Sequence, residues 1–476
     1  MSELYSSPVG HWPPEYSSDF RPSGDDPFWN RELETEPPAQ RDERILKKLR
    51  SQVAWAYERS PFYRRKWDEA GVGPDTLRTL ADLNRFPVVL KAELRLDQEQ
   101  HPPFGSYLCI DRSDVARIHG TSGTTGKPTA FCVGKDDWHR IANAHARVLW
   151  AMGIRPDDTV FIGSFFSLYM GSWATLAGCE RLGATAFPFG AGAPGQTLLA
   201  VRWMRETRPT AFYGTPSYAL YLAEVARAEG IDPRELGLRI LFFSGEPGAG
   251  IPATRKRIED TFGATCHDSG SMAEMTPWAH LGECSERRGM HLWQDIVYAQ
   301  VSNPESFQPV PYGREGTPVY THLERTSQPM IRLVSGDLTT WTDEPCPCGR
   351  TYPRLPRGIY GRIDDQFTVR GENVLPSAIE AVLLATPGYG GEYRIIVSRE
   401  QSMDELVVQT EVDIETDADE ERLEAFRSQL GRELRATLGL RTTIRIERPG
   451  TIPRTEFKAR RVIDDRDLYR QATGRS

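Results

Sequence analysis

One run of eleven residues, 119–129, constrains the fold of this chain most, because it combines the parts of an anion-binding loop. It reads His-Gly-Thr-Ser-Gly-Thr-Thr-Gly-Lys-Pro-Thr, with three glycines, five hydroxyl residues and one lysine. Glycines let the backbone turn and present N–H groups to an anion, hydroxyls add donors, and lysine adds a mobile positive charge. Apolar residues alternate in the flanking segments 115–118 and 130–133. The run therefore predicts a hairpin whose connecting loop holds phosphate groups.

This loop differs from a P-loop in spacing. Five residues rather than four separate Gly120 from Gly126, and Pro128 follows Lys127 where that motif has Ser or Thr. The alternative interpretation is a flexible connection, rich in Gly and Thr, that binds nothing.

Residues 121–128 resemble the phosphate-binding signature of the adenylate-forming enzymes, the superfamily of acyl-CoA synthetases, peptide-synthetase adenylation domains and luciferases. With the further motifs described below, the chain is most similar to the phenylacetate-CoA ligase family, from about Trp29 to about Asp464. The resemblance implies that Lys127 acts in catalysis and that the ATP phosphates are bound by Thr121, Ser122, Gly123, Thr124, Thr125, Gly126 and Lys127.

Composition limits the partners of the chain. Of its 476 residues, 39% are hydrophobic and 26% are charged, and the net charge of −8 argues against nucleic-acid binding. No apolar run approaches the roughly 18 residues of a membrane span. Residues 1–25 lack the basic start and apolar stretch of a secretory signal. We therefore expect a cytoplasmic protein without nucleic-acid or membrane partners, and the resemblance adds a homodimer as a further expectation.

Short apolar runs alternate with helical patterns over most of the chain. Helices are expected at residues 42–70 (interrupted at Ser60-Pro61), 136–152, 169–183 and 198–206. Strands are expected at residues 159–164, 185–189, 211–213 and 236–244. Such alternation predicts an α/β fold, in which ligands collect at the carboxyl ends of the strands.

A domain boundary is expected near residues 360–365. Beyond it, three strands (394–397, 406–412, 443–446) and an amphipathic helix at 419–438 predict an α+β module. Together with the resemblance, this predicts a large adenylate-forming N-terminal domain of sheets and helices and a small mobile C-terminal lid domain. The predicted bounds are residues 1–361, with a loose arm at 1–24, and residues 362–476.

Three motifs resemble the nucleotide site of the family. Gly245, Glu246 and Pro247 follow an expected strand, in the position of a turn that lies against adenine. Residues 267–275, His-Asp-Ser-Gly-Ser-Met-Ala-Glu-Met, stand where the family has Tyr-Gly-x-Ser/Thr-Glu. This match implies a catalytic, magnesium-binding Glu274, and nucleotide contacts by Asp268 and Ser269. Asp337, in Val-Ser-Gly-Asp, would accept hydrogen bonds from both ribose hydroxyls. For the motifs at 245–247 and at Asp337 the alternative is an ordinary turn at a strand end.

Residues 267–275 also depart from the family pattern. Gly270 replaces the aromatic residue that covers adenine, Ser271 replaces a glycine, and Ala273 replaces a hydroxyl residue. Loss of a stacking ring and of one donor would each weaken binding by about 1 kcal/mol. An unusual adenine affinity or an unusual substrate class is therefore expected.

The domain junction and the C-terminus continue the resemblance. Residues 361–365, Gly-Arg-Ile-Asp-Asp, imply that Arg362 reaches ribose or phosphate and that Asp364 is the hinge of lid rotation. Gly371 would line the thiol tunnel after that rotation. Residues 452–458, Ile-Pro-Arg-Thr-Glu-Phe-Lys, imply a catalytic Lys458. Its charge would stabilise a transition state in which a carboxylate approaches a phosphate. The alternatives are a polar linker and a solvated basic tail.

The family resemblance also implies an acyl pocket. Its segments 165–171 and 213–217 would border the acid, and an aromatic lining would suit a flat ring. The implied pocket residues are Phe165, Tyr169, Gly171, Tyr213, Gly214 and Ser271. The alternative is that these aromatic residues belong to the core.

The cysteines carry a second signal. Cys346 and Cys348 lie in Cys-Pro-Cys-Gly, and Cys284 and His291 lie seven residues apart upstream. Three Cys and one His can form a tetrahedral zinc site, and four protein ligands leave no open position for catalysis. The sequence therefore predicts a structural Zn²⁺, with reduced thiols in a loop as the alternative.

These features together predict an enzyme that uses Mg-ATP. By resemblance, it converts an aryl or arylacetic acid to an acyl-adenylate with release of pyrophosphate, and then transfers the acyl group to coenzyme A. One alternative is transfer to an amine or a carrier-protein thiol. Another is a degenerate relative that binds a nucleotide without catalysis.

Overall fold

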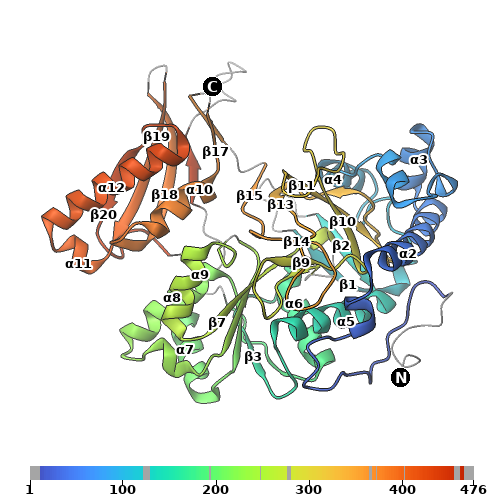
Figure 1. Cartoon of the computed structure of the whole chain (residues 1–476), viewed down its shortest axis with the longest axis horizontal. Coiled ribbons are helices and arrows are strands. Elements are labelled where there is room, and N and C mark those ends of the chain that lie inside the picture. Colours follow the sequence, from blue (N-terminus) through green and yellow to red (C-terminus); the bar gives the residue numbers. More distant parts are fainter. Residues whose placement is uncertain are drawn as a thin grey trace.

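The structure is a computed structural model that describes residues 11–121, 129–191, 195–246, 248–275, 280–363, 367–370, 372–400, 403–454 and 461–465. A large N-terminal part is followed by a smaller C-terminal part that lies against the region of α8 and α9 (Figure 1). This division confirms the predicted α/β fold with a large and a small domain. The bounds at residues 361 and 362 stay a prediction.

The N-terminal part begins with helices that the sequence pattern predicts. The long pattern at residues 42–70 becomes α2 (Pro38–Arg59) and α3 (Pro61–Glu69). Ser60 separates them, because its hydroxyl accepts from the N–H of Tyr63 at 3.1 Å and caps α3. Residues 11–24 contain neither helix nor strand, but Trp12 Nε1 donates to the Leu323 carbonyl at 2.8 Å. This portion of the predicted loose arm is therefore packed on the core.

The central sheet has eight strands in the order β14-β9-β8-β7-β6-β5-β3-β4. Strands β4, β3, β5, β6 and β7 are parallel, whereas β8, β9 and β14 extend the sheet antiparallel. The bounds are β3 Thr159–Ile162, β4 Thr185–Phe187, β5 Ala211–Gly214, β6 Ile240–Phe243, β7 Thr265–Gly270, β8 Leu281–Gly282, β9 Met290–Leu292 and β14 Arg354–Leu355.

Helices separate the parallel strands, as expected for crossover connections. They and the remaining N-terminal helices are α1 Arg31–Glu34, α4 Lys91–Gln100, α5 Lys135–Met152, α6 Met170–Leu182, α7 Gln196–Thr207, α8 Pro216–Ala228 and α9 Pro252–Phe262. The predicted helices 136–152, 169–183 and 198–206 are thereby confirmed. No helix within the described ranges is long and apolar enough to cross a membrane.

A five-stranded sheet leads to the domain junction in the order β10-β11-β13-β15, with β12 paired to β11. Its strands are β10 Val297–Ser302, β11 Glu315–His322, β12 Leu333–Val334, β13 Asp337–Thr340 and β15 Gly361–Arg362. Separately, β1 (Val115–Gly120) and β2 (Ala130–Gly134) pair antiparallel. This pairing confirms the predicted hairpin around the opening motif.

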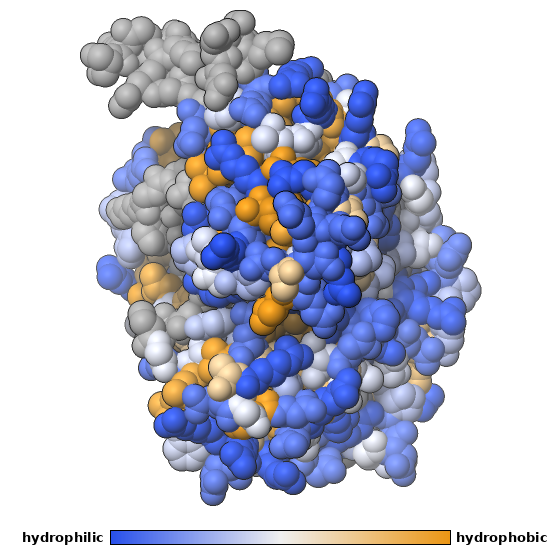
Figure 2. Space-filling view, turned by 90° about the vertical axis from the view of Figure 1, so that its left-hand side faces the viewer, coloured by the Kyte–Doolittle hydropathy of each residue, from blue (hydrophilic) through white to orange (hydrophobic). Residues whose placement is uncertain are grey.

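The C-terminal part is an α+β unit. Its four-stranded sheet has the order β20-β19-β18-β21, next to a hairpin of β16 and β17. The bounds are α10 Pro376–Ala385, α11 Ile414–Asp417, α12 Glu420–Leu438, β16 Phe367–Val369, β17 Glu372–Val374, β18 Tyr389–Glu400, β19 Met403–Val412, β20 Thr443–Glu447 and β21 Val462–Asp464. Phe426, Leu430 and Leu434 of α12 are buried against this sheet. The face on the C-terminal side is mainly hydrophilic, with hydrophobic residues in scattered groups (Figure 2).

Candidate nucleotide and acid site

The hairpin β1–β2 brings the ends of the phosphate-loop motif together. Gly120 pairs with Ala130, and the Thr121 N–H donates to the Thr129 carbonyl at 3.1 Å. The Gly120 N–H also donates to the Leu168 carbonyl at 3.1 Å, which places the loop base beside the start of α6. Of the predicted phosphate ligands, only Thr121 lies within the described residues. Ser122, Gly123, Thr124, Thr125, Gly126 and Lys127 lie outside them.

The predicted adenine-side residues follow two neighbouring parallel strands. Phe243 of β6 pairs with Asp268 of β7, and the Ser269 hydroxyl donates to the Phe243 carbonyl at 2.6 Å. Gly245 has a φ of +96°, a left-handed conformation that favours glycine in the turn after β6. The Glu246 carboxylate accepts from the Ser217 N–H at 2.8 Å and so contacts the first turn of α8. Pro247 lies outside the described residues.

Asp268 is a buried carboxyl in this region. A Cβ added at either Gly250 or Gly358 would lie 2.6 Å from its Oδ2, so two glycines make room for the group. Burial, together with the nearby Glu283 carboxylate, raises the pKa of Asp268 to about 8. The side chain is therefore mainly protonated at neutral pH and can donate a hydrogen bond.

Glu274, the predicted magnesium ligand, lies in a short 3₁₀ turn at Ala273–Met275. Its side chain is buried, and its Oε1 lies 3.5 Å from the Nζ of Lys91 at the start of α4. Sequence reasoning missed Lys91, because an isolated lysine 183 positions upstream gives no local signal. The site therefore contains a cation next to the carboxylate expected to hold magnesium.

Asp337 and Arg362 lie directly opposite one another. They are register partners in the antiparallel pair β13–β15, and Arg362 Nη1 is 2.9 Å from Asp337 Oδ1. Two residues predicted from separate motifs to contact ribose or phosphate are thus adjacent. The same strand pairing places them at the domain junction.

Three hydroxyl groups meet where the acid pocket is predicted. Tyr213 Oη is 2.7 Å from Ser244 Oγ and 3.2 Å from Tyr169 Oη. Phe165 packs on Tyr169 with ring centroids 5.7 Å apart. Gly171 permits this arrangement, because a Cβ there would lie 2.4 Å from Tyr213 Oη. Ser244 was not among the predicted pocket residues, although it directly follows β6 and precedes Gly245.

The other two predicted pocket residues have different neighbours. A Cβ at Gly214 would lie 2.8 Å from the Phe212 ring, and the Ser271 hydroxyl donates to the Met272 carbonyl at 3.2 Å. Neither contact joins them to the hydroxyl cluster. Gly270 is closely packed, because an added Cβ would lie 2.9 Å from Leu281 Cδ1. A side chain cannot replace this glycine unless Leu281 shifts.

Predicted residues near the lid lie partly outside the described ranges, among them Asp364, Gly371 and Lys458. Arg454, four residues before Lys458, lies within them. It is 2.9 Å from Glu411 of the C-terminal sheet and 3.3 Å from Glu224 of α8. The segment that leads to Lys458 is therefore bound to both domains.

The predicted zinc ligands come together. The candidate ligand atoms of Cys284, His291, Cys346 and Cys348 all lie within 4.8 Å of one another. The cluster lies in the antiparallel part of the central sheet and the loop before β14. Cys284 directly follows Glu283, whose carboxylate accepts from the Asp268 N–H at 2.9 Å.

Comparisons with known proteins show the family of the chain. The family described as AMP-binding enzyme matches residues 35–319, and the AMP-binding enzyme C-terminal domain matches residues 371–466. A phenylacetate-coenzyme A ligase of Thermus thermophilus is 37% identical over 453 residues, which are 92% of this chain and 99% of that relative.

Two solved structures of a related ligase match nearly the whole chain. A 2-hydroxyisobutyryl-CoA ligase in the postadenylation state, in complex with R3-HIB-AMP, is 53% identical, with a TM-score of 0.93 and 98% of each chain covered. The ligase of that name in the thioesterification state, with 2-HIB-AMP and CoA, is 54% identical and gives 0.75 over the same shares. Because the match to AMP-binding enzymes spans more than half of the chain and a relative above 30% identity covers nearly all of it, this chain belongs to the AMP-binding, adenylate-forming enzyme family, among relatives of phenylacetate-CoA ligase.

Proposed function

We propose that this protein is an AMP-forming acid–CoA ligase. The observation that carries the proposal is the likeness to 2-hydroxyisobutyryl-CoA ligase bound to an acyl-AMP, at 53% identity over 98% of both chains. The juxtaposition of Asp337 and Arg362 supports it, because a carboxylate can accept from the ribose hydroxyls and a nearby guanidinium can pair with a phosphate.

The reaction has two steps. In the first, a carboxylate oxygen of the acid attacks the α-phosphorus of ATP, and the bond to pyrophosphate breaks. In the second, the sulfur of coenzyme A attacks the acyl carbon, and AMP leaves. In this proposal Lys127 and the loop residues would bind the phosphates, Glu274 would hold Mg²⁺, and Lys458 would stabilise the charge that develops in the first step.

The described arrangement of domains suits the first step. The TM-score is 0.93 to the postadenylation state of the related ligase and 0.75 to its thioesterification state, at nearly equal identity. The two structures hardly differ in identity to this chain or in coverage. We therefore infer that the lower TM-score reflects a different arrangement of the domains in the thioesterification state. The lid would rotate about Asp364 before the second step.

For the acid, a small branched 2-hydroxy acid is the first candidate. It is the substrate type named for the relative at 53% identity. The hydroxyls of Tyr169, Tyr213 and Ser244 could hydrogen-bond a hydroxyl of the acid. An arylacetic acid is the second candidate, favoured by the Phe165 and Tyr169 rings and by the phenylacetate-coenzyme A ligase relative.

The test is pyrophosphate release from Mg-ATP over a panel of 2-hydroxy, aliphatic, aryl and arylacetic acids, each with and without coenzyme A. We expect release that requires an acid and turns over only with coenzyme A, with the acyl-CoA identified by mass spectrometry. Turnover that coenzyme A does not change would instead favour an amine or a carrier protein as acceptor. No release with any acid, while ATP still binds, would favour the non-catalytic alternative.

A matched pair of variants tests the mechanism. Lys458→Ala should abolish acid-dependent pyrophosphate release and leave ATP binding intact. Lys256→Ala changes an exposed lysine of α9 that pairs only with Asp260 among the described residues, and it should behave as wild type. Full activity of Lys458→Ala would contradict the assigned role.

A further inference from the structure

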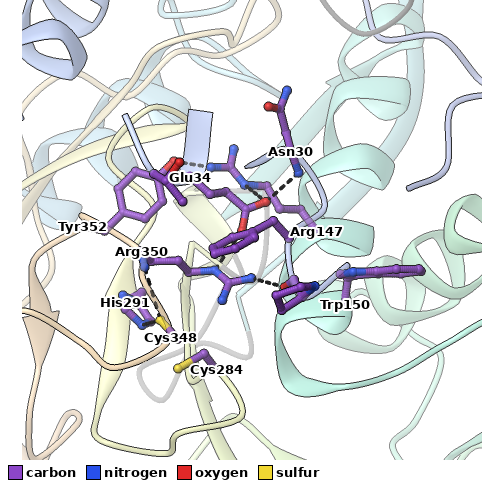
Figure 3. A network of polar contacts seen from close by, with 12 residues as sticks. Asn30, Glu34, Arg147, Trp150, Cys284, His291, Cys348, Arg350 and Tyr352 are labelled. Carbon is purple, nitrogen blue, oxygen red and sulfur yellow. Dashed lines mark hydrogen bonds and ion pairs between the residues drawn. The ribbon is translucent and has the colours of Figure 1, made fainter. Parts of the chain in front are cut away.

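Four side chains that can bind a metal come from distant parts of the sequence and lie within 4.8 Å of one another. Figure 3 labels three of them, Cys284, His291 and Cys348. Cys284 follows β8, His291 lies in β9, and Cys346 and Cys348 lie in the loop before β14. Cys284, His291 and Cys346 are buried, and Cys348 is partly buried. We propose that these four side chains bind one structural Zn²⁺ ion, independently of the ligase reaction.

The distances between the ligand atoms fit one tetrahedral ion. With Zn–S bonds of about 2.3 Å and Zn–N bonds of about 2.0–2.1 Å, two sulfurs lie about 3.8 Å apart and a sulfur and a nitrogen about 3.6 Å apart. The Sγ atoms of Cys284 and Cys346 are 3.8 Å apart, and Cys348 Sγ is 3.5 Å from His291 Nε2. A disulfide needs about 2.05 Å, so the two sulfurs are spaced as ligands of a common ion.

The donor set selects the metal and its role. Three thiolates and one imidazole are soft or borderline ligands, which suit Zn²⁺ and not Mg²⁺ or Ca²⁺. Four protein ligands fill the tetrahedral positions, so no position is left for water or substrate. The ion is therefore structural.

The loop before β14 that contains Cys346 and Cys348, here called the ligand loop, has a backbone that suits metal binding. Gly349 has a φ of +83°, and its N–H donates to the Cys346 carbonyl at 3.0 Å, which closes a tight turn. The N–H of Arg350 points to Cys348 Sγ at 3.5 Å. This donor stabilises a thiolate, as expected for a partner of a metal ligand.

Positive charge lies next to the site. Zn²⁺ with three thiolates carries a net charge of −1. Arg354 is the register partner of His291 across β14 and β9, and it is almost completely buried. Its guanidinium donates to the carbonyls of Glu344, at 2.9 Å, and Arg288. Because these partners are neutral, its charge can offset that of the zinc site.

The ligand loop also holds a buried ion network (Figure 3). Arg350 Nε is 2.8 Å from Glu34 Oε2 of α1, and Arg350 Nη2 donates to the Pro27 carbonyl at 2.7 Å. Arg147 of α5 lies between Glu34, at 3.4 Å, and Asp295, at 2.8 Å. Zinc would therefore join the β8–β9 hairpin to the loop that neutralises Glu34 and thereby to the N-terminal segment.

The experiment measures zinc in the full-length chain, purified without a histidine tag or chelator. Elemental analysis should find one zinc per chain, and replacement by Co²⁺ should give the visible bands of a tetrahedral thiolate site. Cys348→Ser, at the most exposed ligand, should lose the zinc and unfold at a lower temperature. Cys179→Ser, at a buried cysteine of α6 outside the cluster, should keep the zinc.

The zinc content of the wild-type chain tests the proposal even if Cys348→Ser does not fold. Wild-type protein that contains no zinc and takes up neither Zn²⁺ nor Co²⁺ under reducing conditions would overturn the proposal. So would a folded Cys348→Ser variant that still carries one zinc, or a Cys284–Cys346 disulfide in place of the metal. None of these results would alter the expected acid-dependent pyrophosphate release.

Discussion

At the scale of single residues, the pair Asp337–Arg362 offers the most direct test of the proposed nucleotide site. The Arg362 side chain is 31% exposed, so this ion pair contributes little to stability, and its position at the domain junction suits ligand binding. We predict that Arg362→Gln raises the KM for ATP about 10- to 100-fold, because a hydrogen bond to a charged group contributes about 1.5–3 kcal/mol. Steady-state kinetics with varied ATP measures the change.

The control for Arg362→Gln is the exposed pair Lys256–Asp260 of α9. Lys256→Gln should change neither the KM for ATP nor the unfolding temperature. An unchanged KM in Arg362→Gln would remove Arg362 from the proposed site.

The raised pKa of Asp268 predicts how the free energy of unfolding depends on pH. The pKa of this carboxyl is about 8 in the folded chain, because of burial and the Glu283 carboxylate, against 3.8 ordinarily. Its stabilising contribution is therefore complete below pH 3.8 and is lost as the pH rises toward 8. Between these values the free energy of unfolding should fall by about 1.4 kcal/mol per pH unit through this group alone.

The comparison of wild type with Asp268→Asn isolates this contribution. Urea unfolding at several pH values between about 5 and 8 should give a flatter profile for the variant, which cannot ionise. Asp260→Asn, on an exposed turn of α9, should follow the wild-type profile. Parallel profiles for wild type and Asp268→Asn would show that Asp268 is ionised in the folded chain.

At the scale of elements, two glycines of helix α6 allow an effect on packing to be distinguished from an effect on the proposed binding of the acid. A Cβ at Gly171 would lie 2.4 Å from Tyr213 Oη, whereas a Cβ at Gly178 would lie 2.7 Å from His145 Cβ of α5. Both Gly→Ala changes should lower stability, by about 1–3 kcal/mol for overpacking. Only Gly171→Ala should also raise the KM for the acid, about tenfold, because it displaces the hydroxyl cluster.

Kinetics with varied acid at saturating ATP tests this difference. Gly178→Ala is the matched control, since it changes the same helix at a buried contact with α5. If both variants raise the KM for the acid equally, general loosening of α6 would explain the effect. The hydroxyl cluster would then have no specific role in binding the acid.

Elements also differ in how far their sequences specify them. The helix interruption at Ser60-Pro61 is predictable, because proline has no N–H and a serine hydroxyl caps the next turn. Strands β8, β9 and β14 are only two or three residues long, so they contain no readable alternation. Their existence depends on β7 offering a free edge for pairing.

At the scale of the whole molecule, Arg454 connects the domains. It joins the buried Glu411 of the lid to Glu224 of α8, and the exposed fractions of Arg454 and Glu224 are 19% and 37%. Removing the contact between Arg454 and Glu224, whose side chains are both partly exposed, should disfavour the described arrangement by about 0.2–1 kcal/mol. We therefore predict that Arg454→Met slows acyl-adenylate formation up to about fivefold.

The rate of thioester formation, the second step, is the control for Arg454→Met. Thioester formation from supplied acyl-adenylate and coenzyme A should not slow, because it would use the other domain arrangement. Arg422→Met removes an exposed pair with Glu415 inside the lid and should leave both steps unchanged. Equal slowing of both steps by Arg454→Met would mean that Arg454 supports the lid itself and not its position.

The sequence alone determined the local features of this protein. Apolar alternation, breakers and caps specify single segments, so the hairpin around residues 119–129 and the helices and parallel strands of the α/β core were predictable. Motifs with several residues in a short run also identified Asp337, Arg362 and the four cluster residues as candidates. Each motif is short, although the two halves of the cluster, 284–291 and 346–348, lie far apart in the sequence.

Only the tertiary structure decided which distant residues meet. Lys91 beside Glu274, Ser244 beside Tyr213, and Arg350 beside Glu34 carry no local signal, and the last pair is separated by 316 positions. The 3.8 Å distance between Cys284 and Cys346 likewise depends on how β14 pairs with β9. Periodicity reports the conformation and burial of one segment, whereas contacts between segments depend on sheet order, register and packing of the whole chain.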